Sequence, residues 1–216
     1  MIWTLPNILT IGRLLAAPGV ALVFLAFDRP LAGWLALILF VAAGLTDFLD
    51  GWLARRFDQI SAFGKMLDPI ADKAMVIVAL MVIVAQQPRA VPIADAWSFF
   101  VAPGYVAIPA LIIVMRELLV SGLREFLGDI KLPVTRLAKW KTTLQMIAIG
   151  AFFAVEPLTA TIAPSASSDI AAHADTRLSL TQSAMILLWI AAILTAFTGW
   201  HYFVKALPYL RGEEDR

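Results

Sequence analysis

Residues 47–72 read DFLDGWLARRFDQISAFGKMLDPIAD and lie between two apolar runs without charged residues, 30–46 and 74–88. The quoted segment is rich in charged side chains, whereas the flanking runs consist almost entirely of residues that favour a hydrocarbon environment. A helix needs about 20 predominantly apolar residues to cross a bilayer. The pattern therefore predicts two membrane helices joined by a charged segment at one membrane surface.

The composition of the whole chain extends this prediction. Of its 216 residues, 61% are hydrophobic and 15% are charged, and the mean hydropathy is +0.82. A soluble domain is nearer half apolar and about a quarter charged, so there is too little polar surface here for a water-soluble sphere. An abundance of large apolar residues also excludes a disordered chain.

The charge and the rare residue types exclude further classes. A net charge of +1 provides no basic excess for binding nucleic acid. The absence of cysteine excludes disulfides and thiolate chemistry. With only two histidines, a metal site would have to be a hard-cation site built from carboxylates.

Charge-free apolar runs indicate how often the chain crosses the membrane. We expect an all-α polytopic membrane protein, a single domain over residues 1–216, with six transmembrane helices and a short N-terminal interfacial helix over 1–12. An even number of spans places both termini on one side. The six runs cover residues 14–27, 30–46, 74–88, 96–115, 142–155 and 178–204.

The distribution of Lys and Arg predicts the orientation. With this set of spans, the basic residues other than Arg29, Arg89 and Arg177 lie at the inner ends of helices or in inner loops. Cytoplasmic segments carry the excess of Lys and Arg in membrane proteins. We therefore expect a multi-pass protein of the plasma membrane, the inner membrane of a bacterium, with both termini and residues 47–72 on the cytoplasmic side.

Four aspartates in the charged segment have helical spacing. Asp47 and Asp50 are three residues apart, and Asp68 and Asp72 are four apart, so each pair shares a helix face. Two antiparallel helices would bring these faces together, and four converging carboxylates require a cation between them. Mg²⁺ favours carboxylate oxygens, and two such ions can clamp a phosphoryl group. The spacing therefore favours a metal site that acts on phosphate.

Other interpretations explain less of this pattern. Basic neighbours could neutralise the acids as structural ion pairs, but charge balance does not require shared helix faces. A transporter could also place acids in broken helices, although these acids gather at one surface and no inverted repeat is visible. A non-catalytic scaffold would not need the spacing at all. The basic neighbours in question are Arg55, Arg56, Lys65 and Lys73.

The segment also resembles a known signature. Residues 47–72 match D-x-x-D-G-x-x-A-R-(x)8-G-x-x-x-D-x-x-x-D, the signature of the CDP-alcohol phosphatidyltransferases, at all eight fixed positions. The resemblance implies an enzyme that displaces CMP from a CDP-linked lipid with an alcohol acceptor, and it implies a homodimer. Of the four aspartates, which would bind two Mg²⁺ or Mn²⁺ ions, Asp72 would be the general base. The implied CDP-binding residues are Asp47, Asp50, Gly51, Ala54, Arg55 and Gly64, with Arg55 facing the pyrophosphate. Small residues at Gly51, Ala54 and Gly64 could equally serve close helix packing.

A second, basic group of residues bears on the acceptor. Arg116 and Arg124 are eight residues apart, about two helical turns, and Lys139 and Lys141 lie at the start of the fifth predicted span. These four side chains could surround an anion with charge-assisted hydrogen bonds. Contact with anionic lipid at the inner surface is the alternative. We expect a pocket for an acceptor that carries its own phosphate.

Three further stretches resemble family members that use glycerol 3-phosphate. They are PNILTIGR (6–13), RELLVSGLRE (116–125) and AKWKTTLQ (138–145). This resemblance implies that sn-glycerol 3-phosphate attacks CDP-diacylglycerol, giving phosphatidylglycerol phosphate and CMP. Inositol phosphate as acceptor stays open, because it would also suit a cationic pocket, and phosphatidylglycerol as acceptor is a further alternative.

Overall fold

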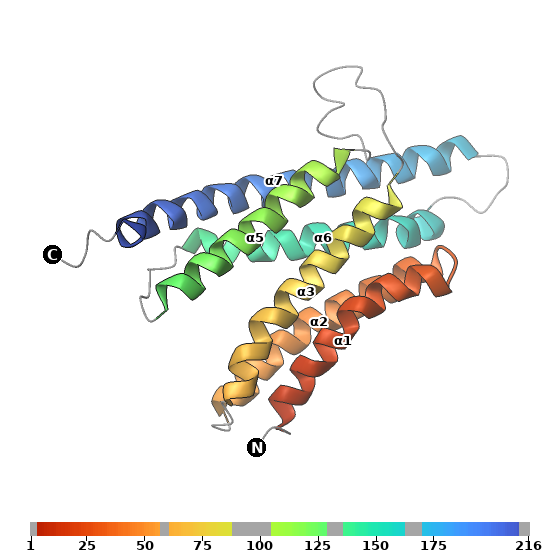
Figure 1. Cartoon of the computed structure of the whole chain (residues 1–216). Helices are drawn as coiled ribbons and strands as arrows, with labels where there is room; N and C mark the ends of the chain where they lie inside the picture. The colour runs from red at the N-terminus through yellow and green to blue at the C-terminus, as the bar shows by residue number, and fades with distance from the viewer. Residues whose placement is uncertain (1–3, 57–60, 88–104, 129–135, 163–169, 212–216) are drawn as a thin grey trace. The chain divides into compact units, whose positions relative to one another are not determined.

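A computed structural model describes residues 4–56, 61–87, 105–128, 136–162 and 170–211 of the chain, and apart from short turns and helix ends these ranges are α-helical (Figure 1). Four stretches within the helices are long and apolar enough to cross a membrane: Leu5–Ala26, Leu31–Asp50, Trp140–Ile162 and Ala172–Leu210. The all-α membrane class is thereby supported, while the prediction of six spans is not confirmed. The helices are α1 (Leu5–Ala26), α2 (Leu31–Arg56), α3 (Ala62–Gln86), α5 (Ala107–Leu127), α6 (Arg136–Ile162) and α7 (Ile170–Leu210).

The start of the chain differs from the sequence-based expectation. Residues from Leu5 to Gly12 form the first turns of α1, which continues without a break to Ala26. Pro6 is compatible with this start, because the first turn of a helix does not need the missing N–H. The separate interfacial helix expected over residues 1–12 is therefore not confirmed.

The chain forms two compact units. The first unit comprises residues 1–87 and 149–181, and the second comprises residues 88–148 and 182–216. Helices α6 and α7 each contribute to both units.

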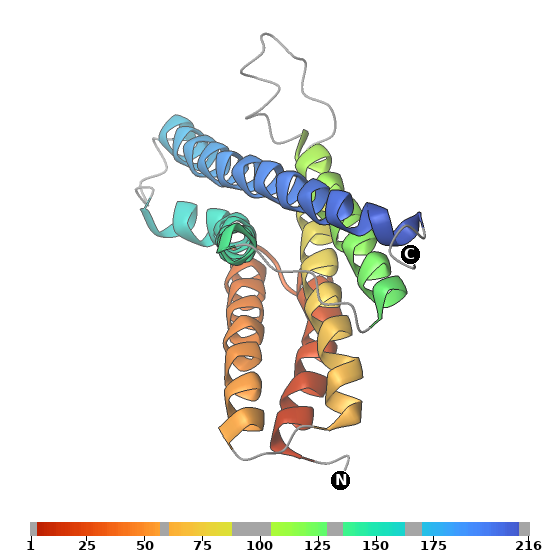
Figure 2. The ribbon, with the colours of Figure 1, turned by 90° about the vertical axis from the view of Figure 1, so that its left-hand side faces the viewer.

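In the first unit, α1 packs against both α2 and α3 (Figure 2). Small side chains let helices approach closely. A Cβ on Gly33 would lie 2.7 Å from Cδ of Pro157, so α2 meets the later part of α6 almost backbone to backbone. Nearby, the rings of Phe40 and Phe153 pack edge to face with centroids 5.8 Å apart. This packing holds the helices that carry the aspartates at fixed positions.

A capping interaction sets the start of α3. The hydroxyl of Ser61, the residue before the helix, accepts a hydrogen bond from the backbone N–H of Gly64 at 2.9 Å. Such a cap satisfies one of the N–H groups that a helix start leaves without an intrahelical partner. Because the helix begins here, Asp68 and Asp72 fall within about the first three turns of α3.

The second unit contains α5 with the early part of α6 and the later part of α7. Its buried apolar side chains include Ile113 and Val120 on α5 and Met185 and Leu188 on α7. Helix α5 ends before Gly128, whose positive φ of 54° is a backbone conformation that favours glycine.

Candidate active site

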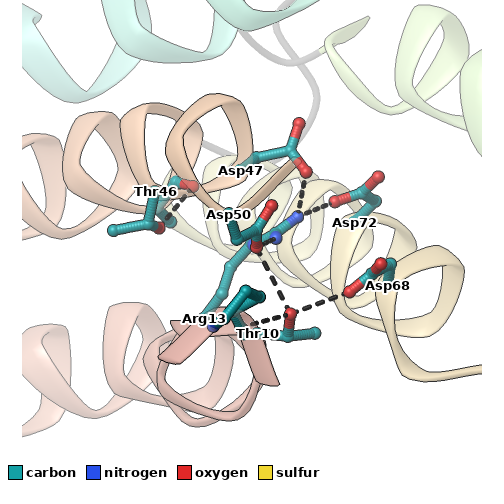
Figure 3. Close-up of polar contacts among 9 residues, drawn as sticks. Thr10, Arg13, Thr46, Asp47, Asp50, Asp68 and Asp72 are labelled. Atoms are coloured by element: carbon teal, nitrogen blue, oxygen red, sulfur yellow. Dashed lines mark hydrogen bonds and ion pairs between the residues drawn. The ribbon is translucent and has the colours of Figure 1, made fainter. Parts of the chain in front are cut away.

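Three helices of the first unit bring six polar residues together (Figure 3). Helices α1 and α3 contribute residues near their starts, and α2 contributes residues near its end. Successive antiparallel helices place these positions at the same end of the unit. The residues are Thr10 and Arg13 on α1, Asp47 and Asp50 on α2, and Asp68 and Asp72 on α3.

Arg13 lies among the aspartates as their cationic partner. Its Nη1 donates to Oδ1 of Asp47 at 2.5 Å and also to Oδ1 of Asp72, while Nη2 donates to Oδ2 of Asp50. The Arg13 side chain is 2% exposed and that of Asp50 is 7% exposed, whereas Asp47 and Asp72 are 50% and 53% exposed. One guanidinium thus links carboxylates from two helices, with two of the three carboxylates reachable from outside.

Thr10 connects the fourth aspartate to the cluster. Its hydroxyl lies 2.8 Å from Oδ1 of Asp68, 3.3 Å from Oδ2 of Asp50 and 3.1 Å from the carbonyl oxygen of Pro6. A hydroxyl carries one proton, so it donates one of these bonds at a time, and the shortest joins Asp68. Thr10 therefore ties α1 to α3 beside the buried Asp50.

Thr10 and Arg13 were not among the residues predicted from the sequence for this cluster. Both belong to the stretch PNILTIGR, for which the sequence indicated only a resemblance to family members. A signal was present, because the two residues are three apart on an otherwise apolar helix and so share a face. A buried cation in a membrane helix also requires anionic partners, and the aspartates were the nearest large group of acids.

The donor set is the kind that a hard divalent cation favours. Four aspartate carboxylates from facing helices supply oxygen ligands of the type that Mg²⁺ and Mn²⁺ take. Within the described ranges, no three acidic or histidine side chains are arranged as a metal shell. The Arg13 guanidinium contacts one oxygen each of Asp47, Asp50 and Asp72. The four aspartates therefore have the ligand chemistry of a metal site, and in this structure three of them contact the guanidinium of Arg13.

The implied CDP-binding residues are only partly described. Gly64 is buried, and a Cβ there would lie 2.8 Å from Oδ1 of Asn7 on α1. At this position the structure favours close helix packing over an open strip for a ligand. The backbones of Gly51, Ala54 and Arg55 belong to α2, but the surroundings of Gly51 and the side chains of Ala54 and Arg55 are not described.

The second unit holds most of the predicted basic group. Glu117 forms ion pairs with Arg116, at 3.2 Å, and with Lys141. The side chains are 13% exposed for Arg116, 5% for Lys141 and 19% for Glu117, so three charges are largely buried together. The guanidinium carbon of Arg124 lies 5.6 Å from the ring centroid of Tyr202, a cation–π contact. The Lys139 side chain lies outside the described residues.

A glycine on α7 makes room for this group. A Cβ on Gly199 would lie 2.6 Å from Cγ of Arg116, so the arginine stem packs directly on the α7 backbone. The Nε of Arg116 is buried and has no hydrogen-bond partner in the described part of the chain. The structure thus brings Arg116 and Lys141 together around the carboxylate of Glu117, and these three side chains carry a net positive charge.

The fold and the two clusters define an all-helical membrane protein with an acidic site on one unit and a basic site on the other. The sequence matches the family model for CDP-alcohol phosphatidyltransferase over residues 3–197, and the chain belongs to that family. The family resemblance noted from residues 47–72 is therefore confirmed.

Three curated relatives are similar over almost their entire length. A Cereibacter sphaeroides protein is 47% identical over 99% of this chain and 100% of its own length. A Rickettsia bellii protein is 40% identical, covering 95% and 96% of the two chains. A Bacillus subtilis protein is 31% identical, covering 94% and 95%. Each of the three is named CDP-diacylglycerol--glycerol-3-phosphate 3-phosphatidyltransferase.

Proposed function

We propose that this chain transfers the phosphatidyl group of CDP-diacylglycerol to sn-glycerol 3-phosphate, releasing CMP and forming phosphatidylglycerol phosphate. The observation that carries the proposal is the 47% identity to the Cereibacter sphaeroides enzyme, which is named for this reaction and aligns over 99% of this chain. An alignment of that extent includes both the acidic and the basic cluster.

Asp47, Asp50, Asp68 and Asp72 would hold two Mg²⁺ or Mn²⁺ ions. When bound, such ions draw negative charge from a diphosphate and so favour departure of CMP. The protein's own part is to supply converging carboxylates on two rigid helices, because a site on helices holds its geometry better than a site on loops.

Asp72 would act as general base. Its side chain is 53% exposed, whereas Asp50 is 7% exposed, so an incoming acceptor can reach Asp72 but not Asp50. Asp72 would take the proton of the acceptor hydroxyl as the hydroxyl oxygen bonds to the lipid-side phosphorus. In the same step the bond from that phosphorus to the CMP oxygen breaks, and CMP carries away the negative charge.

Residues of the signature would hold the CDP group. Arg55 would face the pyrophosphate, and Gly51 and Ala54 would line the site with Asp47 and Asp50. The tight contact between Gly64 and Asn7 gives Gly64 an indirect part, in which it fixes α3 against α1 and so positions Asp68.

The basic group would bind the phosphate of the acceptor. Glu117 neutralises part of the charge of Arg116 and Lys141, and Arg124 and Lys139 add further positive charge. A phosphate dianion compensates such an excess and accepts charge-assisted hydrogen bonds. Serine or choline would not, which favours a phosphorylated alcohol as acceptor.

Membrane topology and assembly follow the same proposal. Six transmembrane helices, both termini and the active site at the cytoplasmic surface of a bacterial inner membrane, and a homodimer would suit an enzyme that uses soluble glycerol 3-phosphate and a membrane-bound donor. The predominance of Lys and Arg at one set of helix ends supports this orientation.

The test is the reaction itself with purified protein in detergent. CDP-diacylglycerol, labelled glycerol 3-phosphate and Mg²⁺ or Mn²⁺ should yield CMP and labelled lipid in equal amounts. Parallel reactions with inositol phosphate and with phosphatidylglycerol test the acceptor. Turnover with one of these in place of glycerol 3-phosphate would refute the proposed acceptor, and no CMP release with any acceptor would refute the reaction.

Replacing Asp72 with Asn should reduce turnover by about 10²-fold or more, the range that a general base contributes. The variant should keep its thermal stability in detergent to within a few degrees, because Asp72 is half exposed. The exposed Asp175 on α7 offers a matched control, and Asp175→Asn should leave turnover unchanged. Turnover by Asp72→Asn close to that of the control would contradict the assignment of the base.

Replacing Arg124 with Ala should raise the KM for glycerol 3-phosphate by about tenfold, equivalent to about 1.4 kcal/mol of lost binding. The KM for CDP-diacylglycerol should change little. Lys205→Ala, an exposed change in α7, controls for the loss of one positive charge. An equal increase in both KM values would show that the basic group does not bind the acceptor.

A further inference from the structure

Arg13 is a buried charge within the acidic cluster, and the proposed reaction gives it no role. It lies on α1, outside the signature, and its guanidinium contacts carboxylates from both α2 and α3 (Figure 3). With 2% of its side chain exposed, it is more deeply buried than any of the three aspartates it contacts.

The contacts of Arg13 take one oxygen from each of three carboxylates that would hold a divalent cation. Nη1 bridges Oδ1 of Asp47 and Oδ1 of Asp72, one from each helix, and Nη2 takes Oδ2 of Asp50. Mg²⁺ requires its oxygen ligands at about 2.0–2.1 Å in a near-octahedral arrangement. A guanidinium fork and a compact cation cannot both occupy the space between the same carboxylates.

The charge balance favours exchange of one cation for another. Among the side chains that the structure describes, the Arg13 guanidinium joins three of the four aspartates, and Thr10 adds only a neutral hydroxyl. Carboxylates this close repel one another, and the low dielectric of a buried site strengthens the repulsion. Arg13 relieves part of this repulsion, and divalent ions would relieve more. The half-exposed sides of Asp47 and Asp72 offer such ions a way in.

The guanidinium also has a donor left over. Its Nε is buried and has no hydrogen-bond partner among the residues that the structure describes. A buried charged group with an unpaired donor is unfavourable, so the present contacts are not the full set that Arg13 can make. An arginine with a spare donor beside carboxylates can turn to another anion once a metal replaces it.

We infer that Arg13 and the divalent cations are alternative partners of the aspartates. Without metal, Arg13 holds Asp47, Asp50 and Asp72 together, and metal binding displaces its guanidinium from these carboxylates. Arg13 is thus a positioning residue that competes with the metal. The inference rests on the proposed function, because it takes the aspartates to be metal ligands.

Direct Mn²⁺ binding to the full chain in detergent, without substrate, tests the inference. The fraction of free Mn²⁺ is measured by electron paramagnetic resonance for wild type, Arg13→Gln, Arg13→Lys and Arg56→Gln. Arg56 is exposed at the end of α2, so its variant removes one positive charge from the same region as a matched control. Arg13→Gln should bind Mn²⁺ at least tenfold more tightly than wild type, and Arg56→Gln should change binding by less than about threefold.

Arg13→Lys keeps the positive charge but lacks the planar fork that bridges several carboxylates. It should therefore bind Mn²⁺ with an affinity between those of wild type and Arg13→Gln, and it provides a second test if the Gln variant does not fold. Thermal unfolding gives an independent readout, since Mn²⁺ should raise the Tm of Arg13→Gln more than that of wild type.

The outcomes separate the inference from the proposed function. If wild type binds Mn²⁺ and both Arg13 variants bind it equally or more weakly, Arg13 supports the metal site rather than competing with it. That result overturns the inference and leaves the metal site intact. If the Arg13 variants bind Mn²⁺ and wild type does not, Arg13 competes with the metal so strongly that it excludes it in the absence of substrate, which supports the inference. No binding by any of the four proteins overturns both the metal site and the inference.

Discussion

Replacing Glu117 with Gln removes the carboxylate that Arg116 and Lys141 share, and its effect on stability can be worked from the burial of the three side chains. Lys141 is 5% exposed and Arg116 is 13% exposed, so both cations would remain largely buried after the change. Removing one partner of a buried ion pair destabilises a protein by about 3–5 kcal/mol. Because Glu117 is 19% exposed, the lower end of that range applies.

A loss of about 3 kcal/mol corresponds to a drop in Tm of about 6–12 °C for a chain of this size. The measurement is thermal unfolding of the purified protein in detergent, followed by circular dichroism or intrinsic fluorescence. The double variant Glu117→Gln with Lys141→Met should recover about half of the loss, since replacing a buried pair by uncharged groups is often neutral. The double variant should not recover its full stability, because Arg116 still lacks its carboxylate partner.

Two results would refute this reasoning. A Tm of Glu117→Gln within about 2 °C of wild type would show that water reaches the pair and screens it. If the stability losses of Glu117→Gln and Lys141→Met simply add in the double variant, Glu117 and Lys141 do not interact, because residues in contact show a coupling energy in a double-mutant cycle.

Two other changes test the packing and the ion pairs of the first unit. Gly64→Ala places a Cβ 2.8 Å from Oδ1 of the buried Asn7 and should lower the free energy of unfolding by about 1–3 kcal/mol. The control Gly12→Ala in α1 places a Cβ that meets nothing within 4 Å, and it should raise the free energy of unfolding by up to about 1 kcal/mol. Equal losses for the two variants in chemical denaturation would contradict the packing assigned to Gly64. Glu156→Gln removes a carboxylate that pairs with Arg29 at 2.7 Å and Arg177 at 2.6 Å, but these arginines are 36% and 51% exposed. The loss should stay below about 1 kcal/mol and shrink further in high salt, and a larger, salt-independent loss would show that the pairs are shielded from water.

Local sequence patterns were sufficient for the helices of the first unit. Residues 31–46 of the first charge-free run lie within α2, and residues 74–86 of the second lie within α3. Apolarity and length predict a membrane helix without knowledge of its neighbours. The ends of helices were less accessible: residues 1–12 were expected as a separate helix, but nothing between Leu5 and Gly12 stops α1 from starting there and continuing.

The aspartate cluster was accessible for the same reason. Spacings of three and four residues place Asp47 beside Asp50 and Asp68 beside Asp72 on any α-helix, and a short connection makes the two helices antiparallel. The sequence by itself thus determined the helical membrane class, the family and the gathering of acids, because these depend on helical periodicity, apolarity and a motif read within one stretch of chain.

Only the tertiary structure decided which cation lies among the acids. Divalent cations were expected among the acids, with the basic residues close in sequence as the less favoured alternative. The guanidinium that contacts the carboxylates comes instead from Arg13, 34 residues before Asp47. The same holds for Gly64, where contact with Asn7 on another helix distinguishes packing from ligand access. Such contacts depend on how helices rotate and pack against one another, and the spacing of residues along a single helix carries no information about the neighbour it will meet.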